Sequence, residues 1–153
     1  MKGYQCIAVA VDSKEEFHTL FHGVKNLMNE ETKLVLCSVV DNRIQDARRV
    51  RTSYRYNSAD EEKEFRTRML EELKEGLKDV PAAEILTYTG VGNPKRVLTR
   101  EVNDIFWPDL MVVGYGGLMD EGRRGHRFLI GSITNYVLHY AECDVLVVKK
   151  TVN

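Results

Sequence analysis

The segment from residue 109 to residue 134, DLMVVGYGGLMDEGRRGHRFLIGSIT, carries the residue types that could bind an anion. Its apolar start at Leu110–Val113 predicts a buried strand. Glycines follow it at positions 114, 116 and 117, and they offer little side chain to hold a ligand away from the backbone. Gly131 and Ser132 then open a helical periodicity, where unpaired N–H groups favour phosphate. Without a ligand, the first three glycines would also suit a tight strand-to-loop turn.

A carboxylate closes the first apolar run of the chain. Gln5–Val11 is almost continuously apolar, as expected for a strand covered on both faces of a parallel sheet, and Asp12 follows it. At this end of a strand, Asp12 could accept a hydrogen bond from a ribose hydroxyl or an adenine amine, provided that its strand lies beside the strand ending at Gly114. The alternative is that Asp12 serves only as a turn or N-cap residue.

Five apolar runs alternate with four helical patterns, and the runs are residues 5–11, 34–40, 83–89, 110–113 and 145–148. The helix starts are marked by two capping boxes, Ser13 with Glu16 and Ser58 with Glu61, by Asn93-Pro94, and by Gly131-Ser132. This order predicts an α/β fold: a doubly wound, five-stranded parallel sheet with helices on both faces. At this length we expect one domain over residues 1–153.

The apolar positions of each helical pattern predict its buried face. In chain order they are Phe17, Leu20, Phe21, Val24, Leu27 and Met28; Phe65, Met69, Leu73 and Leu77; Val97, Leu98, Val102 and Ile105; and Ile133, Val137 and Leu138. A long loop is expected over residues 41–57.

Composition excludes several classes of protein. The chain is 43% hydrophobic with a net charge of −1, which argues against a general nucleic-acid binder. No apolar run is long enough to span a membrane and no signal peptide is visible, so we expect a cytoplasmic protein. The cysteines, Cys6, Cys37 and Cys143, lie in or beside apolar runs and are interpreted as reduced, buried thiols, with redox and metal roles as alternatives.

Other chemistry finds weaker support. No Walker P-loop string occurs, and no Ser, His and acid set can be linked, so an enzyme is not predicted and no catalytic residue is assigned. His18 and His22 are four residues apart, yet they lack the glutamate of a zinc-protease motif and fit the flanks of a buried helix stripe better. The basic stretch RRVRTSYRY, residues 48–56, suits a solvated loop, a partner-protein surface or a nucleic-acid contact.

The chain resembles the universal stress protein family, the Usp domain of the adenine nucleotide alpha-hydrolase-like fold. The resemblance rests on CIAVAVDSKE, LVLCSVVD, TGVGNPKRVLTREV, DLMVVGYGG and FLIGSITNYVLHYAECDVLVVKK, which together span nearly the whole chain. It implies strand order 3-2-1-4-5, a homodimer through the last strand, a protein partner, and ATP, with or without Mg²⁺, as a regulatory ligand. It also implies the ligand contacts, which are Asp12, the backbone of Val39, Gly114, Gly117, Gly131, Ser132 and Ile133.

The glycine motif departs from the family pattern at one point. ATP-binding members have Gly, two residues, Gly, nine residues, Gly and Ser or Thr, and Gly114, Gly117 and Gly131-Ser132 match these positions with thirteen residues in the gap. The four extra residues fall in or near residues 119–124 and could bulge outward while both glycine ends stay in place. The alternative function is therefore a dimeric interaction module that binds no nucleotide. Asp144 is a second departure, at a strand entry where many members have Pro.

Overall fold

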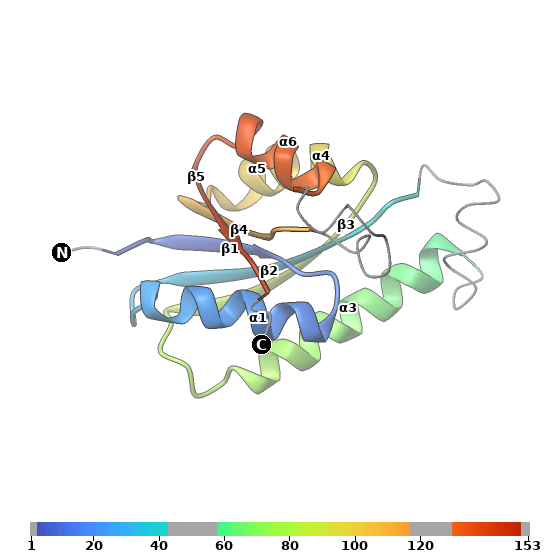
Figure 1. The fold of residues 1–153 in the computed structure, drawn as a ribbon. Coiled ribbons are helices and arrows are strands. Elements are labelled where there is room, and N and C mark those ends of the chain that lie inside the picture. Colours follow the sequence, from blue (N-terminus) through green and yellow to red (C-terminus); the bar gives the residue numbers. More distant parts are fainter. Residues whose placement is uncertain (1–2, 43–57, 117–129, 151–153) are drawn as a thin grey trace.

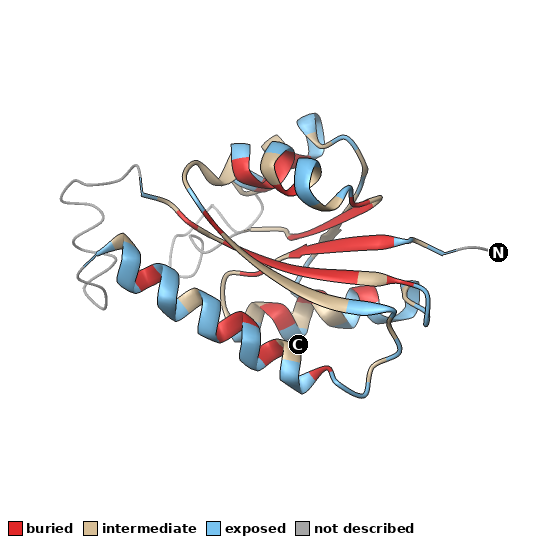
Figure 2. Ribbon diagram, turned by 180° about the vertical axis from the view of Figure 1, so that it is seen from behind, coloured by how far each residue is buried: buried red, intermediate tan, exposed pale blue. Residues whose placement is uncertain are grey.

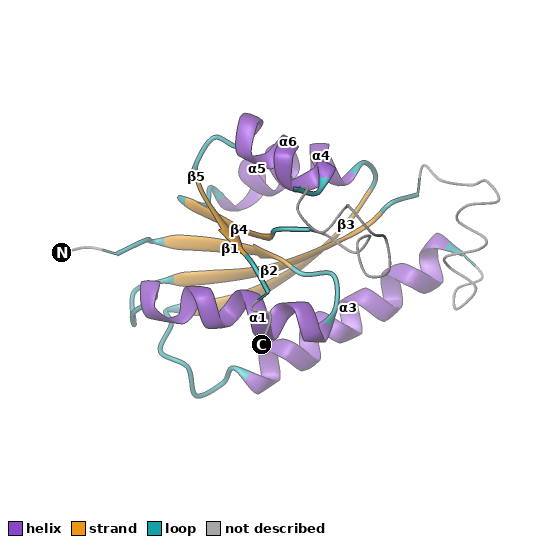
Figure 3. Ribbon diagram, viewed as in Figure 1, coloured by secondary structure: helices purple, strands orange, loops and turns teal. Residues whose placement is uncertain are grey.

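The computed structural model describes residues 3–42, 58–116 and 130–150, and these build one parallel sheet with helices on both faces (Figures 1 and 3). The strand order is β3-β2-β1-β4-β5, and every neighbouring pair is parallel, as predicted. The strands are β1 (Cys6–Ala10), β2 (Lys33–Val40), β3 (Glu84–Val91), β4 (Leu110–Gly114) and β5 (Asp144–Val148). Each begins and ends within two residues of its predicted bounds, the usual margin for element ends.

The helices form two layers, one on each face of the sheet (Figure 1). Helices α1 (Lys14–Val24) and α3 (Ala59–Gly76) cover one face. A composite helix covers the other face together with α6 (Ser132–Tyr140). The composite helix runs through α4 (Pro94–Arg96), the π-helical turn η2 (Val97–Glu101) and α5 (Val102–Phe106), and a short 3₁₀ turn, η1 (Lys25–Leu27), follows α1.

Strand alternation divides the core into two clusters. Ile7 and Val9 of β1 point toward α1 and α3, whereas Cys6 and Ala8 point toward the other helix layer. The three central strands are therefore buried along most of their length, as Figure 2 shows in red. Such burial on both faces explains why these strands read as continuous apolar runs.

Three of the four predicted helix starts have the expected caps. The Ser13 hydroxyl accepts the Glu16 N–H at 3.1 Å, and the Ser58 hydroxyl accepts the Glu61 N–H, also at 3.1 Å. The Asn93 side chain accepts the Lys95 N–H at 3.0 Å. Gly131 is the N-cap of α6 and, having no side chain, makes no such bond.

Four residues predicted on buried helix faces are instead exposed, and a fifth, Leu27, lies beyond the end of α1 and is also exposed. They are Phe65 (46% exposed), Ile105 (52%), Ile133 (39%) and Leu138 (43%). In α6 the buried positions are Thr134 and Val137, so the helix turns a different face to the sheet from the one that its largest apolar residues indicated. The remaining predicted positions of α3 and the composite helix are buried.

The cysteines are free thiols, as expected, although Cys143 is only half-buried. Burial raises the pKa of Cys37 to about 12 and that of Cys143 to about 11, so neither forms a thiolate readily. Asp144, which departs from the family pattern, begins β5 and accepts a hydrogen bond from the Tyr4 hydroxyl at 2.9 Å. No helix of the described ranges is long and apolar enough to cross a membrane.

Candidate functional site

The carboxyl ends of β1 and β4 lie side by side. Asp12 and Gly114 need this arrangement in order to belong to one ligand site. The two strands pair in parallel through Ile7 with Leu110, Ala8 with Met111 and Val9 with Val112. Asp12 follows β1 and Gly114 is the last residue of β4, so both lie at the same edge of the sheet. Sheets of this kind bind ligands at that edge, where the strand order reverses around β1 and β4.

The peptide groups of Val39 face the place where β1 has ended. In a parallel ladder successive residues direct their N–H and C=O groups to opposite neighbours. The Cys37 carbonyl accepts from Val11 on the β1 side at 2.7 Å, and the Val40 carbonyl accepts from Gly92 on the β3 side at 2.9 Å. By this alternation Val39 points its backbone toward β1, whose pairing with β2 stops at Ala10 and Cys37. A planar base could meet a backbone donor and acceptor here.

The start of α6 lies against the end of β4 through backbone bonds. The Tyr115 N–H donates to the Val148 carbonyl, and the Gly131 N–H donates to the Tyr115 carbonyl, both at 3.0 Å. The expectation that the Gly131 N–H is unpaired is therefore wrong. The first intrahelical bond runs from the Asn135 N–H to the Gly131 carbonyl. The N–H groups of Ser132, Ile133 and Thr134 consequently have no acceptor within α6.

A buried threonine fastens this helix start to the strand. The Thr134 hydroxyl donates to the Gly114 carbonyl at 2.5 Å, and Thr134 is 4% exposed. The hydroxyl thus satisfies a carbonyl at the end of β4 and fixes the first turn of α6 beside it. Ile133 and Ser132, one and two positions earlier, are exposed on the same turn.

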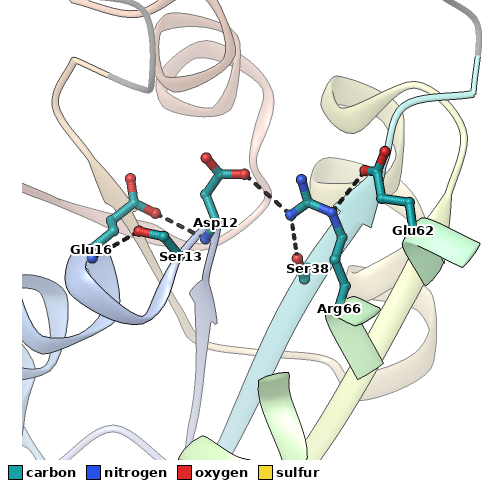
Figure 4. A network of polar contacts seen from close by, with 6 residues as sticks. All are labelled: Asp12, Ser13, Glu16, Ser38, Glu62 and Arg66. Atoms are coloured by element: carbon teal, nitrogen blue, oxygen red, sulfur yellow. Dashed lines mark hydrogen bonds and ion pairs between the residues drawn. The ribbon is translucent and has the colours of Figure 1, made fainter. Parts of the chain in front are cut away.

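The Asp12 carboxylate is held by a half-buried arginine that the sequence did not single out (Figure 4). Nη1 of Arg66, from α3, lies 3.2 Å from Asp12 Oδ1 and 2.9 Å from the hydroxyl oxygen of Ser38. Nε of the same guanidinium donates to Glu62 Oε2 at 2.9 Å. Burial alone would lower the pKa of Arg66, but the two carboxylates outweigh it and leave the pKa above its ordinary value. Arg66 therefore stays charged in place.

Glu16 lies between the two halves of the site. Its Oε1 accepts the Asp12 N–H at 3.1 Å, and its Oε2 lies 3.2 Å from where a Cβ on Gly114 would stand. Burial, and then the negative charge of Asp12, raise the pKa of Glu16 to about 7, against the opposing influence of the bond from the Asp12 N–H and of Arg66. The N-cap alternative for Asp12 is wrong, because Ser13 is the N-cap of α1.

Sequence reasoning missed four residues of this arrangement: Ser38, Glu62, Arg66 and Thr134. A signal existed for two of them, because Glu62 and Arg66 form an i,i+4 pair on the α3 face that also carries Met69 and Leu73. A charged pair on an apolar face indicates a buried polar network.

Several predictions fall outside the described residues. Gly117, the extra residues near 119–124 and the basic stretch 48–56 all belong to the ranges without a structural description. Within the described ranges no three His, Cys, Asp or Glu side chains gather as a metal site would require.

Comparison with known proteins gives one consistent answer. The model of the Universal stress protein family matches residues 3–149. A putative universal stress protein of Staphylococcus aureus (strain USA300) is 27% identical over 147 residues, which cover 95% of this chain and 84% of the relative.

Two solved structures share the fold. Universal stress protein UspA from Lactobacillus plantarum aligns with a TM-score of 0.73 and 23% identity, covering 97% of this chain and 99% of the other. A universal stress protein family protein from Arabidopsis thaliana, solved with AMP bound, aligns with a TM-score of 0.63 and 19% identity, covering 96% and 92%.

Proposed function

Since the chain belongs to the universal stress protein family, which the match over residues 3–149 shows, we propose that it binds an adenine nucleotide, ATP in particular, as a regulatory ligand. In this proposal the protein acts in a stress response through a partner protein and without efficient catalysis. The proposed contacts are Asp12, the backbone of Val39, Gly114, Gly117, Gly131, Ser132 and Ile133.

The observation that carries the proposal is the convergence of three different groups at one edge of the sheet. Asp12 supplies a hydrogen-bond acceptor past the end of β1, and Val39 turns its peptide groups toward the same gap. The start of α6 supplies backbone donors next to the end of β4. An acceptor for a ribose hydroxyl, a donor and acceptor for a base, and donors for phosphate are what a nucleoside phosphate needs.

The fold neighbour with AMP bound supports the nucleotide class without deciding the number of phosphates. ATP is proposed because Gly114 and Gly131-Ser132 stand where ATP-binding members carry their phosphate motif. The thirteen residues between Gly117 and Gly131, where ATP-binding members have nine, are the departure that makes a direct test of ATP binding necessary. Mg²⁺ would accompany the phosphates, and no protein ligand for it is assigned.

The test begins with the purified protein as it is expressed. Denaturation followed by mass spectrometry should release an adenine nucleotide, and calorimetric titration of stripped protein with ATP and Mg²⁺ should show saturable heat. Asp12→Asn should weaken ATP binding, because it removes the charge from the acceptor proposed for the ribose. The absence of both carried nucleotide and heat would favour the rival function, a dimeric interaction module that binds no nucleotide.

We also propose a cytoplasmic homodimer formed through β5. This strand is an edge of the sheet, and Val145 and Val147 on it are only half-buried. Exposed strand edges need covering, and a second copy of the same strand can supply the cover. Light scattering after size-exclusion chromatography should give about twice the mass of the 17.6 kDa chain. A monomer at all concentrations would contradict this part of the proposal.

A further inference from the structure

The Arg66 guanidinium is anchored by side chains from three separate elements (Figure 4). Glu62 lies one turn earlier on α3, Ser38 belongs to β2, and Asp12 follows β1. Ser38 is 1% exposed, Glu62 is 6% exposed, and the Arg66 side chain is 17% exposed. Such enclosure separates this network from the ion pairs of a solvated surface, which contribute little to stability.

The network orients Asp12 on two sides. Its carboxylate is held through Oδ1 by Arg66, and its backbone N–H is held by Glu16 from α1. The second carboxylate oxygen, Oδ2, accepts no hydrogen bond from any described residue and points away from the guanidinium in Figure 4. One oxygen is therefore committed to the protein, and the other is presented at the edge of the sheet where β1 ends.

From this geometry we infer that Arg66 is a positioning residue, which fixes the Asp12 carboxylate so that Oδ2 can accept a ribose hydroxyl. Arg66 would thereby set a preference for ribonucleotides over deoxyribonucleotides. The inference rests on the proposed nucleotide binding and adds to it the residue that controls recognition of the sugar.

The physical reason is preorganisation. A free aspartate side chain must lose rotamer freedom when it takes up a ligand hydroxyl, whereas one held by a charge-assisted bond has lost that freedom on folding. The arginine also neutralises a crowded group of acids, because Asp12 and Glu62 contact it directly and Glu16 lies beside Asp12. Without the guanidinium, mutual repulsion would turn the Asp12 carboxylate away from its present orientation.

The experiment compares ATP with 2′-deoxy-ATP and 3′-deoxy-ATP by calorimetry. The proteins are the unchanged chain, Arg66→Met, Arg66→Lys and the control Arg68→Met. Arg68 is a matched control, because it also pairs with a glutamate four residues away on α3 yet is 65% exposed and does not contact Asp12. Thermal melting of each variant reports whether it is folded.

The unchanged chain should prefer ATP over one of the deoxy analogues by about tenfold or more, as expected for a hydrogen bond to a charged group. In Arg66→Met this preference should fall to about twofold or less, while affinity for the deoxy analogue stays nearly unchanged. Arg66→Lys keeps the charge but lacks the planar fork, so it should lose part of the preference. If Arg66→Met does not fold, the preference measured in Arg66→Lys tests the inference instead. Arg68→Met should keep the full preference.

Three results would overturn the inference while leaving nucleotide binding intact: a chain that binds ATP without a ribose preference, an Arg66→Met variant that keeps it, or an Arg66→Lys variant that keeps it in full. If ATP and both analogues weaken together in folded Arg66→Met, the arginine contacts the ligand itself, which also contradicts a positioning role. Failure of the unchanged chain to bind any of the three nucleotides contradicts the proposed function instead.

Discussion

The two ends of the candidate site are built from different parts of the chain. At the Asp12 end, side chains from β2, α3 and the segment after β1 meet in a partly buried polar network centred on Arg66, and Glu16 of α1 holds the Asp12 backbone beside it. At the α6 end, the groups proposed to bind phosphate are backbone N–H groups of the first helical turn, those of Ser132 and Ile133, and one hydroxyl, that of Thr134, holds the helix to β4. Under the proposed function, recognition of the sugar would therefore depend on which side chains are present, and recognition of phosphate would depend on the path of the backbone.

The largest expected effect is at the backbone end. Gly131→Val should weaken ATP binding by about 100-fold or more, because a Cβ would keep phosphate from the helix N–H groups. The fold should survive, since Gly131 has φ −63° and ψ 151°, which valine adopts without strain. Calorimetry gives the affinity and urea unfolding gives the stability. Gly76→Val is the control, because nothing lies within 4 Å of its added Cβ. Unchanged affinity in Gly131→Val would show that phosphate is held elsewhere.

The next effect tests whether one hydroxyl fixes the backbone end. Thr134→Val keeps the shape of the side chain but leaves the Gly114 carbonyl without its donor, which should cost about 1–3 kcal/mol of unfolding free energy. Urea unfolding measures the cost. Thr67→Val removes an exposed hydroxyl bond to Thr89 and should cost less than about 0.5 kcal/mol. Equal losses of unfolding free energy in the two variants would mean that the Thr134 bond stabilises the protein no more than an exposed hydroxyl bond does.

Glu16 joins the two ends and should make stability depend on pH. Because burial raises its pKa to about 7 in the folded protein, from 4.5, the folded state holds the proton more tightly than the unfolded state. Its contribution is therefore largest below pH 4.5 and is lost as pH rises through 7, by about 3 kcal/mol in all. Glu16→Gln should remove this slope and be the more stable protein at pH 8. The check is urea unfolding from pH 4 to pH 8, and parallel curves for the two proteins would contradict it.

The smallest effect is expected at Gly114, where the two ends meet. A Cβ at Gly114 would lie 3.2 Å from Glu16 Oε2, the far end of a flexible side chain that can shift, so Gly114→Ala should cost about 1 kcal/mol or less. Gly90→Ala is the contrasting variant, since its Cβ would lie 2.6 Å from Val97 Cγ1 in the packed core. Thermal unfolding should rank Gly90→Ala as clearly less stable, and the reverse order would mean that Glu16 is held rigidly.

The sequence predicted the sheet well because its signals are local. Continuous apolar runs mark the buried strands, and Ser13, Ser58 and Asn93 mark helix starts through bonds to N–H groups two or three residues away. Strand order is not local. It followed from the family resemblance, and the structure confirmed it.

The polar network could not be read from the sequence because it joins distant residues. Arg66 is 54 positions from Asp12 and 28 from Ser38, and only its bond to Glu62 has a helical spacing. The same limit applies to Thr134, whose partner Gly114 lies 20 positions earlier. The predicted buried faces of the helices were wrong where a large apolar side chain was assumed to be buried, as at Phe65. Such a side chain can remain at the surface of a folded protein.

Because β1 ends before β2 does, two adjacent residues of β2 should differ in the range of amino-acid substitutions that they tolerate. Ser38 acts through its hydroxyl and is enclosed, so few replacements can keep its bond to Arg66. Val39 turns its peptide groups toward the gap, and every amino acid except proline carries the same two groups there. A saturation library selected for nucleotide binding should therefore accept many apolar substitutions at position 39 and almost none at position 38.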